Sequence, residues 1–284
     1  MIDKNKLKKI RLIVSDLDGT LLNHQALIGD ESKKLIHELI KHEVQFSFAS
    51  GRLHSALIHF AEELDLKSPL ISLDGCMIKS HPEGKIIFES FVKEKYIKKA
   101  IYLADKFLLN IALCHADAIY YTENNSIIPR IMDKFGAKYE EVDSYKNYSK
   151  ETLEVVFASD YKDNLKYVKD KMSFPHSLGL SASYFKSQSH EGIYNLELRR
   201  QGSSKGKGLQ KLINYLNVVP EESAVIGDWY NDVSLFETKA VKIALSNSVP
   251  EIKRMADLVM QRSNDQDGVA EFLELVLKAK KDKY

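Results

Sequence analysis

Near its N-terminus the chain alternates short apolar runs with amphipathic stretches of helical period. The run 10–16, IRLIVSD, is rich in β-branched residues, which is typical of a strand buried on both faces. Residues 31–42 place their apolar side chains on one helical stripe, and 53–64 repeat that pattern. Two further strands are predicted at 44–50 and 68–75. This β-α-β-α-β order predicts a parallel sheet with crossover helices.

The pattern of the chain changes after residue 75. A hairpin is predicted first, with its turn at Pro82–Gly84. Helices are then predicted near 93–108, 126–135 and 161–172, and strands around 110–121, 153–160, 178–185 and 192–199. This order of elements fits an α+β domain better than a doubly wound sheet.

The β-α rhythm returns in the last third of the chain. Helices are predicted at 205–216, from about 231, at 250–256 and at 268–280, and strands at 223–228, 241–246 and 257–260. The simplest architecture is an α/β core made of residues 1–87 and 192–284, interrupted by an inserted α+β domain at 88–191. The basic segment 4–9, KNKLKK, is predicted to be a solvated lead-in to the first strand.

Polar motifs gather at the carboxyl ends of the core strands, where open α/β sheets bind their ligands, or at the start of the following helix. These motifs are Asp16 and Asp18 after the first strand, Ser50-Gly51-Arg52 after the second, Lys205 at the start of the helix 205–216, and Asp228 with Asp232 after the strand 223–228. Any one of them alone would be read as a helix cap or a solvated side chain. Because all of them fall on one edge of one sheet, the sequence predicts a functional site there.

Composition excludes several classes of partner. Forty-one Lys and Arg against 40 Asp and Glu leave a formal charge of +1, which gives no reason to expect nucleic acid or an anionic membrane. The mean hydropathy of −0.29 and the lack of a long apolar run predict a protein with no membrane segment. The two cysteines, Cys76 and Cys114, have no metal-site or disulfide spacing, so a cytoplasmic location is expected.

Four motifs of this chain resemble those of the haloacid dehalogenase superfamily, and in particular its Cof-type phosphatase branch. They are DLDGTLL at 16–22, ASGR at 49–52, GSSKGKGL at 202–209 and IGDWYNDVSLF at 226–236. The C-terminal ALSNSVPEIKRMADLV and SNDQDGVAEFL also match the branch. The resemblance covers nearly the whole chain. It implies a Rossmann-like core, a mobile C2-type cap formed by the insertion, and hydrolysis of small phosphate esters.

The clustered acids also suggest a chemistry of their own. A strand-end carboxylate such as Asp16 could attack phosphorus and form an aspartyl-phosphate, which divides one difficult displacement into two easier ones. Several acids would repel a phosphate unless a hard cation lay between them, and Mg²⁺ prefers such oxygen ligands. The resemblance implies Asp16 and Asp228 as side-chain ligands of Mg²⁺ and Asp18 as a backbone-carbonyl ligand. The Asp18 side chain would then serve as general acid and base.

The remaining motif residues receive supporting roles. The resemblance implies that the phosphoryl group is bound by Ser50, Gly51, Lys205 and Asn231. Thr20 and Asp232 are expected to orient the residues that touch substrate and metal. The acid at position 18 favours a phosphatase or phosphomutase, because the resemblance implies that dehalogenases lack it. The substrates implied first are sugar phosphates, followed by pyridoxal phosphate.

Two alternatives to a phosphatase stay open. A phosphomutase would share the first motif, and a non-catalytic binding protein could share the fold, although the presence of all the motif acids and Lys205 argues against it. Two departures from the branch bear on substrate choice: Asp74 stands where Asn is common, and Trp229-Tyr230 replaces smaller or polar residues. In the insertion, His115, Asp117 and Arg130 are candidates for contacting the leaving group. The sequence gives no prediction of oligomeric state.

Overall fold

The chain forms two compact units in a computed structural model that describes residues 3–122, 127–129, 137–187 and 190–282. The core unit comprises Met1–Gly51, Leu57–Phe88 and Ser204–Tyr284. The second, the inserted unit, comprises Glu89–Ser203 together with the short segment Arg52–Ala56. The core is therefore assembled from both ends of the chain, as its β-α pattern predicts.

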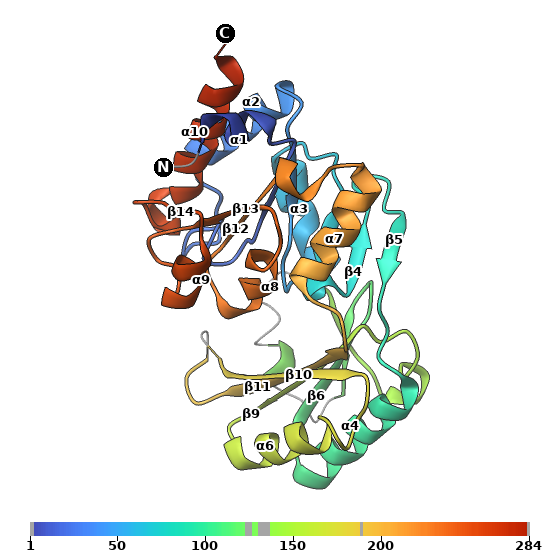
Figure 1. Ribbon diagram of the computed structural model, residues 1–284. Coiled ribbons are helices and arrows are strands. Elements are labelled where there is room, and N and C mark those ends of the chain that lie inside the picture. The colour runs from blue at the N-terminus through green and yellow to red at the C-terminus, as the bar shows by residue number, and fades with distance from the viewer. Residues whose placement is uncertain (1–2, 123–126, 130–136, 188–189, 283–284) are drawn as a thin grey trace. The chain divides into compact units, whose positions relative to one another are not determined.

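A five-stranded parallel sheet forms the centre of the core unit, in the order β14-β13-β12-β1-β2 (Figure 1). Its strands are β1 (Leu12–Ser15), β2 (Gln45–Phe48), β12 (Ser223–Gly227), β13 (Val241–Ala244) and β14 (Leu258–Val259). Strand β1 pairs in parallel with β12 on one side and with β2 on the other. Strand β1 thus lies inside the sheet, next to the edge strand β2.

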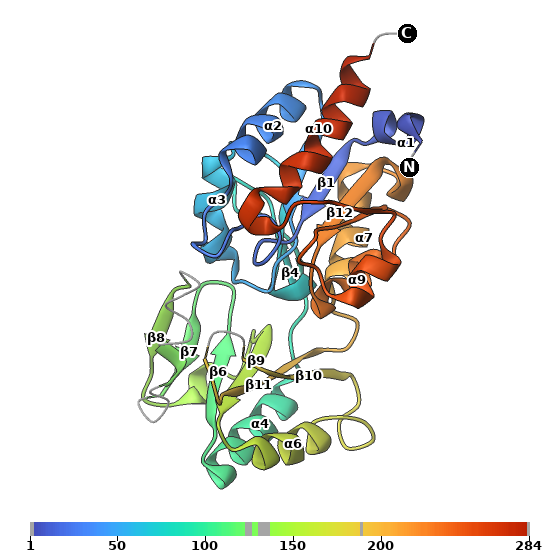
Figure 2. The same cartoon turned by 90° about the vertical axis from the view of Figure 1, so that its left-hand side faces the viewer.

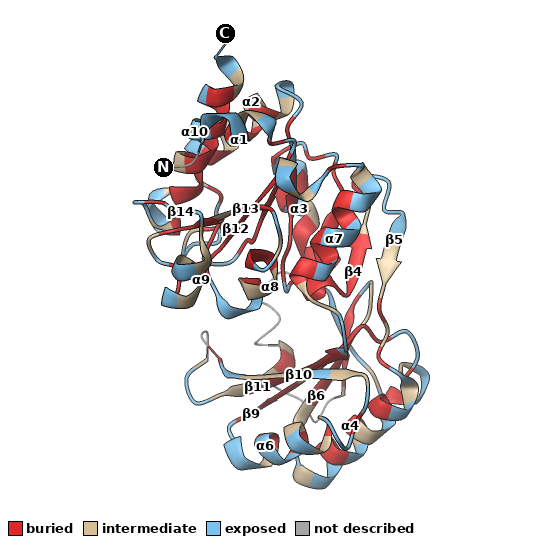
Figure 3. Cartoon of the chain, in the orientation of Figure 1, coloured by how far each residue is buried: buried red, intermediate tan, exposed pale blue. Residues whose placement is uncertain are grey.

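Helices cover both faces of this sheet, so that α2 and α10 lie on one side and α7 and α9 on the other (Figure 2). They are α1 (Lys4–Lys9), α2 (Asp30–Lys41), α3 (Ile58–Glu63), α7 (Lys205–Leu216), α8 (Val233–Phe236), α9 (Pro250–Met255) and α10 (Gly268–Lys281). Ile13 belongs to the apolar cluster with α2 and α10, whereas Leu12 and Val14 belong to the cluster with α7. The prediction that the run 10–16 forms a strand buried on both faces is confirmed for β1. The burial colours of Figure 3 show the same for the sheet as a whole.

A smaller sheet, in the order β3-β4-β5, completes the core unit. It consists of β3 (Leu70–Ser72), β4 (Met77–Lys79) and β5 (Ile86–Glu89), the last two forming the predicted hairpin. The predicted strand 68–75 is shorter in the structure, because Leu73 and Asp74 take left-handed φ values of 47°. A single parallel bridge, Ala49 with Ile71, joins β3 to the end of β2.

The inserted unit is an α+β body built on a six-stranded sheet in the order β10-β11-β9-β6-β7-β8. Its strands are β6 (Asn110–Cys114), β7 (Ile119–Tyr121), β8 (Tyr139–Glu141), β9 (Glu154–Ser159), β10 (Leu180–Lys186) and β11 (Tyr194–Arg200). Helices α4 (Glu94–Phe107) and α6 (Lys162–Lys171) bury their apolar sides against one face of the sheet. Six short 3₁₀ turns lie among the described residues of the two units: His54–Leu57, Leu73–Gly75, Tyr145–Asn147, Pro220–Glu222, Tyr230–Asp232 and Asn264–Gln266.

The structure differs from the sequence predictions at two further places. The insertion ends at Ser203 and not at 191, because β11 pairs with both β10 and β9 and belongs to their sheet. The segment 4–9 is a short helix, capped by the Asp3 side chain and held through buried Leu7, and not an irregular lead-in. The helix predicted at 126–135 falls largely outside the described residues.

Among the described residues, no helix is both long enough and apolar enough to cross a membrane.

Candidate active site

The carboxyl ends of three neighbouring strands bring the first set of motif residues together. Asp16 follows β1, Asp228 follows β12, and Ser50 lies two residues beyond β2. The Asp16 backbone N–H donates to Ile226 O at 2.9 Å, so the ladder with β12 continues up to the acid itself. Because β1 lies between β12 and β2, Asp16 is the central residue of this edge.

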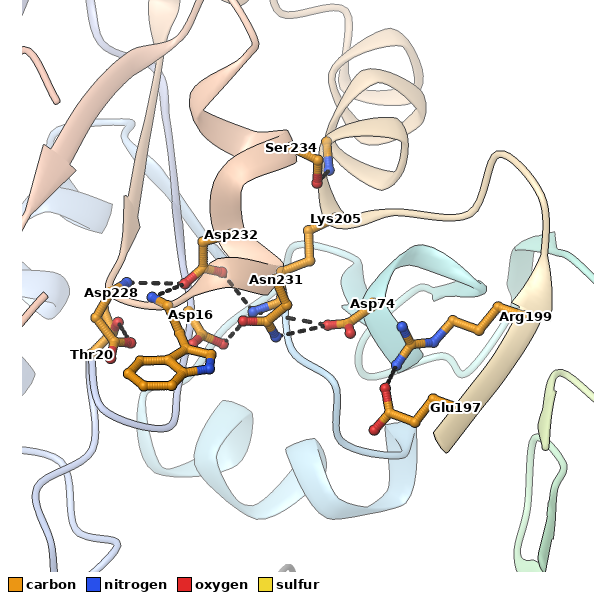
Figure 4. A network of polar contacts seen from close by, with 12 residues as sticks. Asp16, Thr20, Asp74, Glu197, Arg199, Lys205, Asp228, Asn231, Asp232 and Ser234 are labelled. Carbon is orange, nitrogen blue, oxygen red and sulfur yellow. Dashed lines mark hydrogen bonds and ion pairs between the residues drawn. The ribbon is translucent and has the colours of Figure 1, made fainter. Parts of the chain in front are cut away.

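Lys205 is the cation of the cluster and its side chain is fully buried. Its Nζ donates to Asp16 Oδ1 at 2.8 Å and to Asp232 Oδ1 at 2.7 Å (Figure 4). Asp74 Oδ1 lies 3.9 Å from the same nitrogen. Burial acts to lower the pKa of the Lys205 ammonium, but the carboxylates around it outweigh burial and raise that pKa. The lysine is therefore charged throughout the physiological range.

Asp232 holds the loop after β12 in place. Its Oδ2 accepts from the backbone N–H of Asp228 at 2.9 Å and of Trp229 at 3.1 Å, while Oδ1 accepts from Lys205. Gly227 leaves the space for this carboxylate, since a Cβ there would lie 2.6 Å from Asp232 Cγ. With both oxygens occupied in this way, Asp232 is placed to orient Asp228 and Lys205.

The turn after β1 brings Thr20 onto Asp228. Thr20 Oγ1 donates to Asp228 Oδ1 at 2.7 Å. Gly19 takes a φ of +79°, and a Cβ at that position would lie 2.6 Å from Asp228 Oδ2. Glycine is needed there for both reasons, because the backbone is left-handed and the acid occupies the space of a side chain.

Two asparagines in the last part of the chain support the same turn, and no role was predicted for them from the sequence. Asn247 Nδ2 donates to Gly19 O at 2.8 Å, and Asn264 Nδ2 donates to Leu22 O at 2.9 Å. The backbone N–H of Asn264 donates to Asn247 Oδ1 at 3.0 Å, which links the two. They lie in the motifs ALSNSVPE and SNDQDG, so the family resemblance of those segments was the signal that could have identified them.

The acids of the cluster carry more negative charge than Lys205 can balance. Desolvation by burial raises the pKa of Asp16 well above its ordinary value, and it raises the pKa of Asp228 to about 7. Carboxylate oxygens of Asp16, Asp228 and Asp232 lie within 4.8 Å of one another. Hard oxygen donors at this spacing fit a divalent cation such as Mg²⁺. With Asp232 engaged as described, Asp16 and Asp228 are the side chains that could hold it.

This charge excess predicts an unusual pH dependence of stability in EDTA. Between pH 4 and about pH 7 the folded protein keeps a proton on Asp228 that the unfolded chain has released. The free energy of unfolding should therefore fall as pH rises across this window, by up to ~1.4 kcal/mol per pH unit. Urea unfolding at a series of pH values measures it. Asp228→Asn should show a shallower slope than the wild type, and Mg²⁺ should restore stability at the neutral end. Equal slopes in the two proteins would contradict the assignment.

The other predicted site residues differ in how far they are buried. Asp18 is exposed, whereas Ser50 is 1% exposed and its backbone N–H donates to Ile71 O at 3.0 Å. Gly51 lies against Asp74, because a Cβ built on it would be 3.4 Å from Asp74 Oδ1. Asn231 is exposed and its Nδ2 donates to Asp74 Oδ1 at 3.2 Å.

Asp74 therefore belongs to the cluster, although its sequence position indicated only a departure from the Asn that is common in the Cof-type branch. It is 6% exposed and is the third carboxylate close to Lys205, after Asp16 and Asp232. Asp74→Asn keeps the acceptor for Asn231 and a residue type that tolerates the left-handed backbone, but it removes a negative charge. We expect KM for a phosphate monoester to fall about fivefold, with kcat changed less, because one repulsion of about 1 kcal/mol is relieved. Steady-state kinetics in Mg²⁺ measures both constants, and a higher KM would contradict this role.

The residues of the inserted unit that were predicted to contact the leaving group make hydrogen bonds within that unit. His115 Nε2 lies 2.9 Å from Tyr148 O and 3.2 Å from Thr152 Oγ1, and burial lowers the pKa of its imidazole. Asp117 Oδ2 accepts from the Tyr120 hydroxyl at 3.0 Å. Arg130 lies outside the described residues. His115 and Asp117 thus have structural partners.

The parallel sheet and its edge define an α/β enzyme core whose lysine and carboxylates suit chemistry on an anionic group. The family model for haloacid dehalogenase-like hydrolases matches residues 13–273, and the chain belongs to this family.

Individual relatives extend this comparison over most of the chain. Phosphatase YwpJ of Bacillus subtilis is 26% identical over 291 residues, covering 94% of this chain and 100% of that protein. The 5-amino-6-(5-phospho-D-ribitylamino)uracil phosphatase YwtE of the same organism is 25% identical, covering 94% and 98%. The crystal structure of a haloacid dehalogenase-like hydrolase from Bacteroides thetaiotaomicron superposes with a TM-score of 0.82 at 25% identity, covering 93% and 98%. The fold class predicted from the sequence is confirmed.

Proposed function

We propose that this protein is a Mg²⁺-dependent phosphatase that hydrolyses small phosphate monoesters through an aspartyl-phosphate on Asp16. The observation that carries the proposal is the buried pair of Asp16 and Lys205, 2.8 Å apart, beside Asp228 at the carboxyl edge of the sheet. A carboxylate fixed in this way can act as a nucleophile, and the buried cation opposes the charge of an incoming phosphoryl group. Relatives named as phosphatases support the same reaction.

Asp16 and Asp18 would divide the chemistry between them. A carboxylate oxygen of Asp16 attacks phosphorus, the P–O bond to Asp16 forms, and the ester P–O bond breaks. Exposed Asp18 gives its proton to the leaving alkoxide, and its carboxylate then takes a proton from the water that attacks the aspartyl-phosphate. Phosphate and the free Asp16 carboxylate are the products of this second step. Mg²⁺, held by Asp16, Asp228 and the Asp18 carbonyl, would supply charge neutralisation for the phosphoryl oxygens.

The surrounding residues would bind and orient the phosphoryl group. Ser50, the Gly51 amide and Lys205 would hold its oxygens, with Asn231 placed by its hydrogen bond to Asp74. Thr20 and Asp232 keep the Asp228 carboxylate and backbone in position. Fixed donors of this kind need no reorganisation when charge develops on the phosphoryl group.

Sugar phosphates are the first substrate class to test. YwtE and YitU of Bacillus subtilis are named for a phosphate ester whose alcohol is a ribityl chain carrying a uracil ring. These names support a sugar-derived phosphate, and pyridoxal phosphate is the next class on chemical grounds. A phosphomutase would convert a hexose 1-phosphate without releasing phosphate, so this substrate distinguishes it from the proposed phosphatase.

Activity is expected to depend on the metal. Treatment with EDTA should lower phosphate release from a generic aryl phosphate by at least about 100-fold, because the acids around Asp16 then repel the substrate. Added Mg²⁺ should restore the rate, while Ca²⁺, which tolerates a looser geometry, should restore less. Colorimetric phosphate release measures all three states. Hydrolysis that continues at full rate in EDTA would reject the metal requirement.

A cytoplasmic location forms part of the proposal. Cys76 and Cys114 are both buried, lie in different units and form no disulfide with each other. Thiols of this kind suit a reducing compartment.

A further inference from the structure

Two adjacent aromatic side chains interrupt the acidic loop after β12. Trp229 and Tyr230 stand between Asp228 and the residues Asn231 and Asp232, all of which take part in the site. Trp229 is 41% exposed and Tyr230 is 55% exposed. Their rings meet edge to face, with centroids 5.2 Å apart and planes at 74°. The two loop positions between Asp228 and Asn231 thus carry large aromatic rings that are partly exposed to solvent.

The backbone of this loop fixes where the rings begin. The Trp229 N–H donates to Asp232 Oδ2 at 3.1 Å, and the same oxygen accepts from the N–H of Asp228. Consecutive Cα atoms lie about 3.8 Å apart, so the indole starts one residue from an acid that faces the phosphoryl site. The alcohol part of a bound ester begins at that same site. The rings are therefore within reach of the leaving group.

The chemistry of the pair points to a flat ligand. An edge-to-face contact holds one ring at a steep angle to the other, and the exposed faces are apolar surfaces with a negative π-cloud. Neither residue supplies a charged group, so binding on these ring faces comes mainly from stacking. A planar heterocycle gains most, because stacking on an aromatic side chain is worth roughly 10-fold to 100-fold in binding.

We propose that Trp229, supported by Tyr230, selects phosphate esters whose alcohol carries a planar ring, by stacking on that ring. This inference rests on the proposed phosphatase function and names the substrate class within it. Trp229 is then a specificity-determining residue, and the phosphoryl chemistry stays with Asp16 and Asp18. Ring-bearing esters should be hydrolysed with a higher kcat/KM than the same sugar phosphate without a ring.

Two matched substrate pairs test the selection at different distances between ring and phosphate. They are flavin mononucleotide with ribitol 5-phosphate, and uridine 5′-phosphate with ribose 5-phosphate. We expect a ratio of kcat/KM of at least about 10 in favour of the ring in one pair. Trp229→Leu should lower that ratio towards 1, and Trp229→Phe, which keeps a ring, should retain most of it. Tyr215→Leu removes an exposed ring from α7 and should leave the ratio at the wild-type value.

A binding measurement gives a second readout that does not depend on turnover. Trp229 is the single tryptophan of the chain, so the indole emission of the protein reports on this position alone. In Asp16→Asn with Mg²⁺, uridine 5′-phosphate should quench this emission saturably and ribose 5-phosphate should not. N-acetyltryptophanamide in the same solutions corrects for absorption by the ligand.

The outcomes separate this inference from the function on which it rests. Equal kcat/KM within both pairs, or a ring preference that survives in Trp229→Leu, would overturn the role of Trp229 while leaving the phosphatase intact. Absence of phosphate release from all four esters and from a generic aryl phosphate would overturn the proposed function itself. Saturable quenching by uridine 5′-phosphate together with loss of the ratio in Trp229→Leu would support both.

Discussion

Asp16→Asn should lower kcat for phosphate release by at least about 10⁴-fold, because the amide is a poor nucleophile for phosphorus. The substitution keeps the size of the side chain and can still accept from Lys205, which now donates at 2.8 Å. Burial raises the pKa of this acid, and repulsion by Asp232 and Asp228 raises it further, so a neutral amide at this position relieves both unfavourable effects. The folded protein should consequently lose little stability.

The experiment pairs turnover with unfolding. Phosphate release from a generic aryl phosphate gives kcat, and urea unfolding in the same buffer shows that the variant is folded. Asp30→Asn is a matched control, because the Asp30 side chain in the first turn of α2 is fully exposed and outside the site. Activity that persists in folded Asp16→Asn would mean that another group attacks phosphorus.

Among the substitutions described for the core unit, Lys205→Met should cause the largest loss in the free energy of unfolding. The methionine can fill the space of the lysine stem, but it leaves Asp16 and Asp232 buried without their cation. Removing one partner of a buried ion pair typically costs about 3–5 kcal/mol. Phosphate release should fall with it, since no fixed cation then faces the phosphoryl group.

The pH dependence of this loss identifies its cause. The pKa of Lys205 is raised in the folded protein. The charged lysine therefore contributes fully to the free energy of unfolding at every pH below the ordinary pKa of a lysine, and this contribution is lost only at pH values above those of the experiment. Changes between acidic and mildly alkaline buffer therefore come from the acids, which protonate more readily in the variant. The deficit should be smallest in acid and largest in alkali, measured by urea unfolding in EDTA. Lys207→Met, at an exposed position on the same helix, should show no such deficit, and equal deficits at both pH values would contradict the charge argument.

The fold could be predicted from the sequence where local pattern and final environment agree. The run 10–16 has no polar face, and β1 is indeed buried on both sides between two layers of helices. The end of the insertion could not be placed in this way. Strand β11 and helix α7 are separated by only a few residues. The pairing of β11 with β9 is a contact between distant segments, and the local sequence pattern does not indicate it. The capped helix at 4–9 was missed because its single buried anchor, Leu7, gives no helical period.

The residues of the site could likewise be predicted where their place follows from the local sequence, and not where it depends on contacts between distant segments. Asp16, Lys205 and Asp228 could be proposed together because each stands at the end or start of an element that meets the same sheet edge. Asp74 was recognised only as an unusual residue, since its approach to Lys205 depends on a left-handed turn after β3. The support of the Gly19 turn by Asn247 depends on a contact across 228 residues, which no spacing within one segment reveals.

The place of β1 between β12 and β2 also orders events during synthesis. Strand β1 and Asp16 leave the ribosome early, but β12 and Lys205 follow only after the whole inserted unit has been made. The inserted unit is almost one continuous stretch of chain with its own apolar cluster, so it can fold while the core is still incomplete. Until residue 205 emerges, the acid at the end of β1 has no cation and one edge of β1 has no partner. The nascent N-terminal segment is thus the part of this protein that most needs protection from premature association.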